Sequence, residues 1–145
     1  MYTISREYWF SAAHRIEGHP KCGRLHGHNY KVTVAIQSHS LPDNGMLIDY
    51  SELDAICKPI IESLDHRYLS SISNMRNDDP YGRIATLRGD AVELHVPAST
   101  GEHIAEFLWK RFWDALQESQ CRCERGELSV TVSETPKSTA LYDFR

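Results

Sequence analysis

Hydrophobic and polar residues alternate along two segments near the start of the chain, residues 2–15 and 25–37. A period of two predicts β-strands, because successive side chains of a strand point to opposite faces of a sheet. Gly18, Pro20 and Gly23 lie between the two segments and are typical of a loop. The sequence therefore predicts two strands that form a hairpin with a sizeable loop. The residues that share one face are Tyr8, Phe10, Ala12 and His14 on the first strand, and His26, His28, Tyr30, Val32, Val34 and Ile36 on the second.

A helical period replaces the alternation in residues 49–66. Ser51 and Asp54 resemble a capping pair near the start of this predicted helix. Pro59 is expected to kink or split the helix, because proline lacks the backbone donor of a helix interior. The hydrophobic stripe that we expect to face the core consists of Leu53, Ile56, Ile60 and Leu64.

The last third of the chain predicts a second helix followed by a second hairpin. Ser99 or Thr100 can cap a helix over residues 102–118, whose hydrophobic stripe is assigned to packing. Residues 127–134 then alternate cleanly, and residues 138–144 follow after a short turn. The predicted order of elements is therefore ββααββ. The stripe of the second helix consists of Ile104, Phe107, Leu108, Phe112 and Ala115.

Residues 70–98 give the least regular pattern. Residues 84–96 look like a minor hairpin around Arg88-Gly89-Asp90, and we interpret this triplet as turn chemistry and not as an adhesion signal. We treat the segment as an insertion within a single domain that spans residues 1–145, since this length is typical of one globular domain.

Composition narrows the class of protein. The first residues lack the layout of a signal peptide, and no apolar run approaches the roughly 18 residues of a membrane span. We therefore expect a soluble, cytoplasmic protein whose four cysteines are reduced thiols. The formal net charge of -4 argues against sequence-independent binding of nucleic acid, which depends on a basic surface.

Three histidines form the strongest candidate site. His26 and His28 lie two apart on one strand, so their side chains project to the same face. If the first two strands pair antiparallel, His14 lies across from them. Three histidines with a vacant position are the ligand set of a catalytic zinc ion, whereas a closed set of four is structural. The sequence therefore predicts a Zn²⁺ site at these three residues.

Cys22 and the pair Asp65-His66 each allow two interpretations. The Cys22 thiolate would close a structural Cys-His site if it bound the same ion, or act as a base or nucleophile if it lay beside an open site. Asp65 could orient the His66 imidazole for proton transfer, or the histidine could simply interact with the end of a helix.

Two glutamates are also candidates. Glu134 continues a hydrophobic series on one strand face, so it either reaches solvent or needs donors from a ligand. A planar heterocycle with two adjacent N–H groups, such as guanine or pterin, would satisfy this carboxylate. Glu102 fits a capping box as the fourth residue of Ser99-Thr100-Gly101-Glu102, and it could also contact a ligand.

These motifs together resemble the 6-pyruvoyltetrahydropterin synthase and 6-carboxytetrahydropterin synthase family, nearly end to end. The resemblance implies an α+β tunnelling fold, with a four-stranded antiparallel sheet and helices on one face. It also implies assembly into oligomeric barrels, typically a hexamer of two trimers with active sites between subunits. The segments that carry it are Phe10 to His14, Cys22 to Tyr30, Leu64 to His66, Ser99 to Glu102, and Glu134-Thr135.

The same resemblance implies a role for each candidate residue. His14, His26 and His28 would hold zinc, and Cys22, Asp65 and His66 would perform acid–base catalysis. Glu134 would anchor the pterin ring, with Thr100 and Glu102 nearby. The substrate implied is 7,8-dihydroneopterin triphosphate. Composition alone offers Lys21, Arg24 and Lys137 as candidates to bind its triphosphate.

Two products are possible within this family. Loss of triphosphate and acetaldehyde gives 6-carboxytetrahydropterin on the route to queuosine, whereas elimination of triphosphate with isomerisation gives 6-pyruvoyltetrahydropterin. The short spacing from Cys22 to His26 resembles the queuosine-route enzymes, so we favour the carboxy product. The alternatives are the pyruvoyl reaction, a pterin side-chain aldolase, and a non-enzymatic domain with a structural zinc ion. Cys121 and Cys123 are interpreted as a helix-end feature and not as a second metal site.

Overall fold

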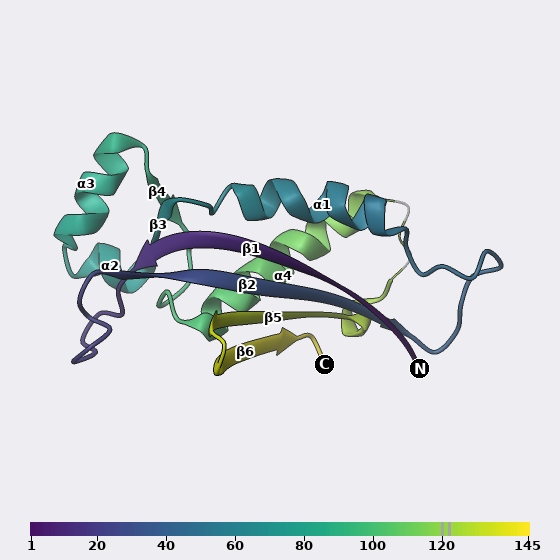
Figure 1. Ribbon diagram of the computed structural model, residues 1–145. Helices are drawn as coiled ribbons and strands as arrows, with labels where there is room; N and C mark the ends of the chain where they lie inside the picture. The colour runs from purple at the N-terminus through teal and green to yellow at the C-terminus, as the bar shows by residue number, and fades with distance from the viewer. Residues whose placement is uncertain (120, 122) are drawn as a thin grey trace.

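The computed structural model describes residues 1–119, 121 and 123–145. Its strands form one sheet in the order β4-β3-β1-β2-β5-β6, with the helices arranged as Figure 1 shows. The strands are β1 (Tyr2–His14), β2 (His26–Ser38), β3 (Arg67–Ser70), β4 (Ala91–Glu93), β5 (Leu128–Thr135) and β6 (Ser138–Asp143). The α-helices are α1 (Tyr50–Glu62), α2 (Ile72–Arg76), α3 (Pro80–Arg88) and α4 (Gly101–Glu118), and a 3-10 turn spans Arg125–Glu127.

The four strands predicted from the alternating pattern are confirmed as a continuous antiparallel unit. β1 pairs with β2 over its whole length, and β2, β5 and β6 follow in antiparallel pairs. The sheet is larger than predicted, because β3 and β4 extend it beyond β1 in parallel orientation. These two strands are only four and three residues long, so they are too short to give a clear alternating pattern.

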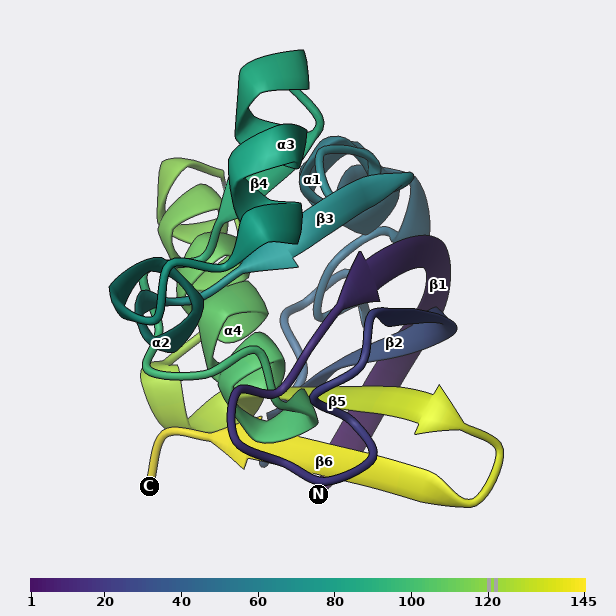
Figure 2. The same cartoon turned by 90° about the vertical axis from the view of Figure 1, so that its left-hand side faces the viewer.

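The hydrophobic core lies between the sheet and the helices α1 and α4. Figure 2 shows the sheet curling around these helices, which cover one of its faces. The faces predicted from the alternation are the buried ones: Tyr30, Val32 and Val34 are fully enclosed. On α4, Trp109 is buried and donates its indole N–H to the carbonyl of Leu128 at the start of β5, at 2.9 Å. Packing of the amphipathic helices onto the sheet therefore fixes the two long strands from one side.

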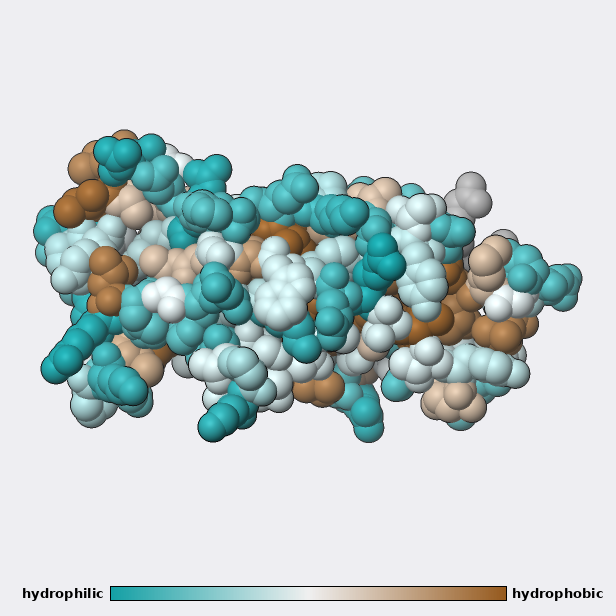
Figure 3. Space-filling view, in the orientation of Figure 1, coloured by the Kyte–Doolittle hydropathy of each residue, from teal (hydrophilic) through white to brown (hydrophobic). Residues whose placement is uncertain are grey.

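Residues 84–96 do not form the hairpin that the sequence predicted. Residues 80–88 are helix α3, and β4 follows it and pairs with β3. Asp79 caps the helix ahead of Pro80, and Gly89 ends it in the left-handed conformation with φ of 74°. The Arg88-Gly89-Asp90 triplet is therefore a helix end. In Figure 3 hydrophobic side chains are exposed where α3 lies, and those of Ile84 and Leu87 are among the exposed hydrophobic residues.

Helix α1 differs from two detailed predictions. α1 is capped by Asp49, whose side chain accepts from the Ser51 amide, and not by a Ser51–Asp54 pair. Asp54 instead binds the Arg6 guanidinium. Pro59 lies inside α1 without splitting it, on an exposed side where water can satisfy the freed carbonyl.

The start of α4 confirms the prediction that Thr100 can cap this helix. The Thr100 side chain accepts from the His103 amide. The capping box predicted with Glu102 does not form, because the residue three positions after the cap is His103.

Candidate active site

Three imidazoles meet where β1 ends and β2 begins. His14 lies directly opposite His26 in the antiparallel register, and Ala12 lies opposite His28. Their candidate ligand nitrogens all fall within 4.8 Å of one another. The spacing that predicted a common face for these side chains therefore brings the three residues together as expected. His14 is buried, whereas His26 and His28 are partly exposed.

Backbone carbonyls orient two of the three rings. His14 donates from Nδ1 to the carbonyl of Ser99 at 2.7 Å, and His26 donates from Nδ1 to the carbonyl of Arg24 at 2.7 Å. A carbonyl oxygen only accepts, so the Nε2 atom of each neutral ring is left with a lone pair. Burial lowers the pKa of His14 to about 4, which keeps this ring neutral near pH 7.

The free nitrogen atoms fit a divalent cation. The Nε2 atoms of His14 and His26 are 3.1 Å apart, so two lone pairs face each other unless a cation or proton lies between them. Nε2 of His28 is buried and has no hydrogen-bond partner. Zinc prefers imidazole nitrogens, and a carbonyl bound to the second ring nitrogen is the usual support of such a ligand. The donor set therefore fits a zinc ion held by three histidines.

Gly27 permits the close approach of the two strands at this site. A Cβ atom at position 27 would lie 2.9 Å from the backbone oxygen of Ala12, which is shorter than a normal contact. We therefore expect Gly27→Ala to push β2 away from β1, to weaken zinc retention, and to lower the free energy of unfolding by about 1–3 kcal/mol. Urea unfolding measures the second effect. In the control Gly126→Ala the added atom would meet its nearest neighbour at an ordinary 3.5 Å, and equal unfolding midpoints for the two variants would contradict the prediction.

Glu134 lies beside the histidine cluster. Its Oε2 atom is 3.7 Å from Nε2 of His28, and its side chain is partly exposed. Oε1 lies 3.4 Å from the position that a Cβ atom would take on Gly101, so the start of α4 comes close to this carboxylate. Together with Gly101 and Glu102, Glu134 lines a small cavity of about 120 Å³ between α4 and the β5–β6 hairpin. The carboxylate can therefore receive N–H donors from a ligand next to the three histidines.

The Cys22 thiol lies outside the histidine cluster. Among the residues that the structure describes, the metal-binding cluster consists of the three histidines alone. The backbone of Cys22 is fixed in the loop between β1 and β2, because its amide donates to Nδ1 of His19 and its carbonyl accepts from the amide of Ile16. This arrangement weighs against a structural site closed by Cys22.

Asp65 and His66 form a hydrogen-bonded pair. Asp65 Oδ2 accepts from Nδ1 of His66 at 2.8 Å, and Asp65 Oδ1 accepts from the amide of Ser11 at 2.8 Å. The Ser11 amide and the His66 ring together lower the pKa of Asp65, which keeps it ionised. His66 is strongly exposed and has a positive φ of 57°. The carboxylate thus sets the orientation of an exposed imidazole.

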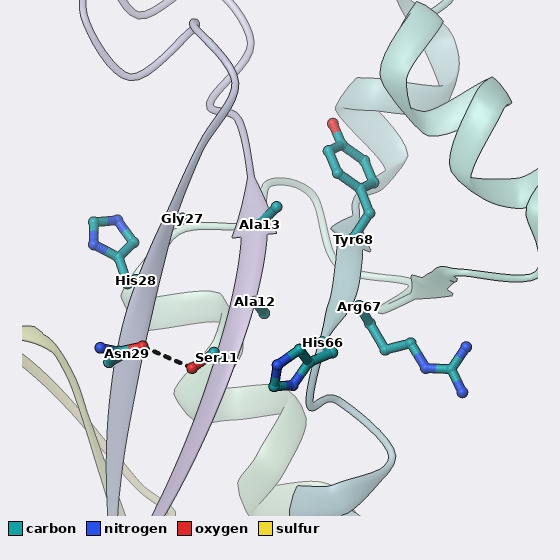
Figure 4. A pocket seen from close by; sticks show the side chains of 9 residues that line it. All are labelled: Ser11, Ala12, Ala13, Gly27, His28, Asn29, His66, Arg67 and Tyr68. Atoms are coloured by element: carbon teal, nitrogen blue, oxygen red, sulfur yellow. Dashed lines mark hydrogen bonds between the residues drawn. The ribbon is translucent and has the colours of Figure 1, made fainter.

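His66 lines an open cavity of about 520 Å³, and Ser11, Asn29 and His28 are among the other residues that line it. Figure 4 shows the His66 ring beside Ser11, which is hydrogen-bonded to Asn29, while the His28 ring points away from His66. Ser11 and His14 are three residues apart on β1, which corresponds to about 10 Å along a strand. Within one chain, the structure therefore groups Glu134 with the histidines and places the Asp65–His66 pair further along β1.

The remaining predicted residues lie around these groups. Thr100 uses its hydroxyl to cap α4, and Glu102 is exposed at the edge of the small cavity. The three basic candidates for the triphosphate are all exposed. They are Lys21, Arg24 and Lys137.

Sequence reasoning missed the residues that support the histidine cluster. Ser99 orients His14 through its backbone carbonyl, an interaction that residue type does not reveal. Arg15 follows His14 directly and binds Asp79, 64 positions later. A charged residue next to a predicted ligand was the available signal, but its partner could not be found without the fold.

A cluster of three histidines with an adjacent carboxylate is an arrangement found in metal-dependent enzymes. The chain belongs to the 6-pyruvoyl tetrahydropterin synthase family, whose sequence model matches residues 3–144. A relative from Haemophilus influenzae named 6-carboxy-5,6,7,8-tetrahydropterin synthase is 35% identical over 150 residues, covering 98% of this chain and 99% of the relative. One of the same name from Synechocystis is 33% identical over 114 residues, covering 74% and 86%.

Solved structures show the same fold. A 6-pyruvoyltetrahydropterin synthase from Plasmodium vivax, solved as a catalytic-residue mutant, aligns with a TM-score of 0.78 at 21% identity and covers 97% of this chain and 96% of that one. The enzyme from Caenorhabditis elegans aligns with a TM-score of 0.72 at 24% identity and covers 99% and 96%. The predicted tunnelling fold is thereby confirmed. The described residues contain no helix that is both long and apolar enough to cross a membrane.

Proposed function

We propose that this protein is a zinc-dependent 6-carboxytetrahydropterin synthase. It would convert 7,8-dihydroneopterin triphosphate to 6-carboxy-5,6,7,8-tetrahydropterin, with loss of acetaldehyde and triphosphate, on the route to queuosine. The observation that carries this proposal is the placement of Glu134, whose carboxylate lies 3.7 Å from the His28 ring of the histidine cluster. The name of the relatives from Haemophilus influenzae and Synechocystis supports the carboxy product.

The residues of the chain suit distinct steps of this reaction. Glu134 would accept two N–H groups from the pterin ring and so place the side chain of the substrate over the three histidines. A zinc ion held by these histidines would supply Lewis-acid polarisation of the side-chain oxygens. Cys22 and the Asp65–His66 pair would move protons, with Asp65 holding the His66 ring in one orientation. Thr100 and Glu102 would border the ring pocket.

Free strand edges support the proposed oligomer of two trimers. Among the described residues, β3 pairs with β1 only at Ala12 and Ala13, so most of that side of β1 has no strand partner. β6 lies at the other end of the sheet and pairs only with β5. Long unpaired edges are usually covered in a native assembly. Assembly edge to edge would bring the Asp65–His66 pair of one chain toward residues of the next.

Product identification tests the proposal. Purified protein loaded with zinc should release acetaldehyde from 7,8-dihydroneopterin triphosphate and yield the 6-carboxy product by mass spectrometry. Formation of 6-pyruvoyltetrahydropterin without acetaldehyde would assign the pyruvoyl reaction instead, and turnover only of the dephosphorylated substrate would assign an aldolase. A folded, zinc-loaded protein without any turnover would indicate a structural zinc domain.

Asp65→Asn separates orientation of His66 from binding of the substrate. An amide can present N–H₂ toward Nδ1, which removes the acceptor that fixes the ring. We expect kcat to fall by about 100-fold, within the usual range for acid–base catalysis, while zinc content and KM change little. Steady-state kinetics and metal analysis measure both. A variant with wild-type kcat would show that the His66 ring needs no such partner.

A further inference from the structure

The segment of residues 70–98 is tied to the Cys22 loop, which we define as residues 15–25. Figure 1 shows α2 and α3 at the same end of the sheet as this loop. The side-chain amide of Asn74, on α2, donates to the carbonyl of Arg15 at 3.3 Å, and the Ser99 hydroxyl donates to the same carbonyl at 3.2 Å. The insertion therefore holds the chain where β1 leads into the Cys22 loop.

The Arg15 side chain also contacts other residues of the Cys22 loop. Its Nε donates to the carbonyl of Gly23 at 2.8 Å, and its guanidinium lies 3.4 Å from Glu17. Because Gly23 follows Cys22 directly, and the Cys22 amide and carbonyl are already bound within the loop, the backbone around the thiol is fixed on both sides. The position of the Arg15 guanidinium thus sets the position of the Cys22 backbone.

Asp79 holds that guanidinium from the insertion. Its Oδ1 atom lies 3.1 Å from Nη1 of Arg15, and only 2% of the Asp79 side chain is exposed. The other carboxylate oxygen, Oδ2, accepts a hydrogen bond from the Tyr68 hydroxyl. Burial is the main cause of a raised pKa for Tyr68, so this hydroxyl remains a donor. One buried carboxylate therefore binds two partners that belong to different elements.

Tyr68, the second partner of Asp79, lies close in the chain to the Asp65–His66 pair. Tyr68 lies on β3, two residues after His66, and β3 meets β1 only at Ala12 and Ala13. Because only these residues of β1 pair with β3, side-chain contacts contribute much of the stability of this pairing. Tyr68 also lines the open cavity beside His66.

We propose that Asp79 is a positioning residue, which holds the Cys22 loop through Arg15 and the Asp65–His66 pair through Tyr68 in one fixed arrangement. This inference rests on the proposed function for the roles of Cys22 and His66. The insertion, through Asp79, then fixes the positions of two segments that carry proton-transfer groups and lie far apart in the sequence.

Limited digestion with trypsin tests whether Asp79 holds the Cys22 loop through Arg15. This experiment needs no pterin substrate. Lys21 and Arg24 are exposed in the Cys22 loop, so release of the loop increases cleavage there. Asp79→Ala should be cut after Lys21 and Arg24 at least about tenfold faster than wild type, since local opening governs proteolysis of folded proteins. Asp79→Asn keeps the helix cap and an acceptor oxygen and should restore most of the protection.

Asp54→Ala is the matched control. Asp54 binds Arg6 and the Tyr8 hydroxyl in the same way, at a distance from the loop. Loop cleavage in Asp79→Ala that is no faster than in Asp54→Ala, at equal thermal stability, would overturn the proposal. If Asp79→Ala does not fold, Arg15→Gln removes the ion pair with Asp79 and leaves Asp79 bound to Tyr68. For this variant too we expect about tenfold faster cleavage of the Cys22 loop.

Tyr68→Phe tests whether Asp79 positions the Asp65–His66 pair through Tyr68. This change removes the hydroxyl that binds Asp79 and keeps the ring. We expect loop cleavage within about twofold of wild type, kcat reduced at least about fivefold, and KM and zinc content nearly unchanged. A wild-type kcat in this variant would contradict the proposal. If the wild-type protein forms no 6-carboxy product, the proposed function fails, whereas the digestion result still decides whether Asp79 holds the loop.

Discussion

Replacing His26 with alanine should abolish both zinc retention and turnover. His26 belongs to the cluster of three histidines whose candidate ligand atoms lie within 4.8 Å of one another, and we expect the two that remain to lose the proposed ion on dialysis. Loss of Lewis-acid stabilisation worth several kcal/mol corresponds to a fall in kcat/KM of about 10³-fold or more. Metal analysis after dialysis and steady-state kinetics with 7,8-dihydroneopterin triphosphate measure the two effects.

His26 is the best of the three ligands for this experiment because it is partly exposed, whereas His14 is buried and its replacement would disturb the core. His39→Ala serves as the control, since His39 is an exposed histidine in the loop after β2. Removal of zinc from the wild type by a chelator should reproduce the loss, and added zinc should reverse it. A His26→Ala variant that loses its zinc and keeps its turnover would refute metal-dependent chemistry.

Glu134→Gln should impair the enzyme through recognition of the ring. The glutamine keeps the size of the side chain but opposes one ring N–H with its own N–H₂ group. Hydrogen bonds to a charged group contribute about 1.5–3 kcal/mol each, so the loss of one or two predicts a fall in kcat/KM of about 10²-fold or more. Steady-state kinetics with the triphosphate substrate and the binding affinity for a simple pterin both measure the loss of ring recognition.

Zinc content distinguishes this effect from damage to the metal site. Glu134 is near His28 but is not one of the clustered ligands, so the variant should retain its zinc. Glu118→Gln, an exposed change at the far end of α4, should leave both zinc and kinetics as in the wild type. Unchanged pterin binding by Glu134→Gln would show that the ring is anchored elsewhere.

The long strands and the clustering of the three histidines could be predicted because both follow from local periodicity. Alternation along β1 and β2 fixes which residues face the helices, and His14, His26 and His28 simply continue that pattern. The hairpin register then follows from burying these faces, since a slip by one residue would expose the core side chains. The position of Glu134 beside His28 depends on how β2 pairs with β5, so the sequence predicted its face but not its neighbour.

The prediction of a hairpin over residues 84–96 was wrong because helix signals and strand signals overlap in this segment. Asp79-Pro80 at the start and Gly89 at the end are the usual boundaries of a helix, yet hydrophobic residues between 84 and 96 suggested a hairpin. The pairing of β3 with β1 and β4 involves contacts distant in the sequence, and the tertiary structure decides them. The Arg15–Asp79 ion pair has the same origin, which is why it could not be found from residue types.

Residues 99–101 lead into α4 and contact both the histidine cluster and Glu134. Ser99 holds the His14 ring, Thr100 caps the helix, and Gly101 packs against Glu134. The separation between the histidine cluster and the Glu134 carboxylate is therefore set by one short stretch of backbone. A redesign for a wider heterocycle would leave this stretch intact and enlarge the opposite wall of the small cavity, at Thr139 and Ala140.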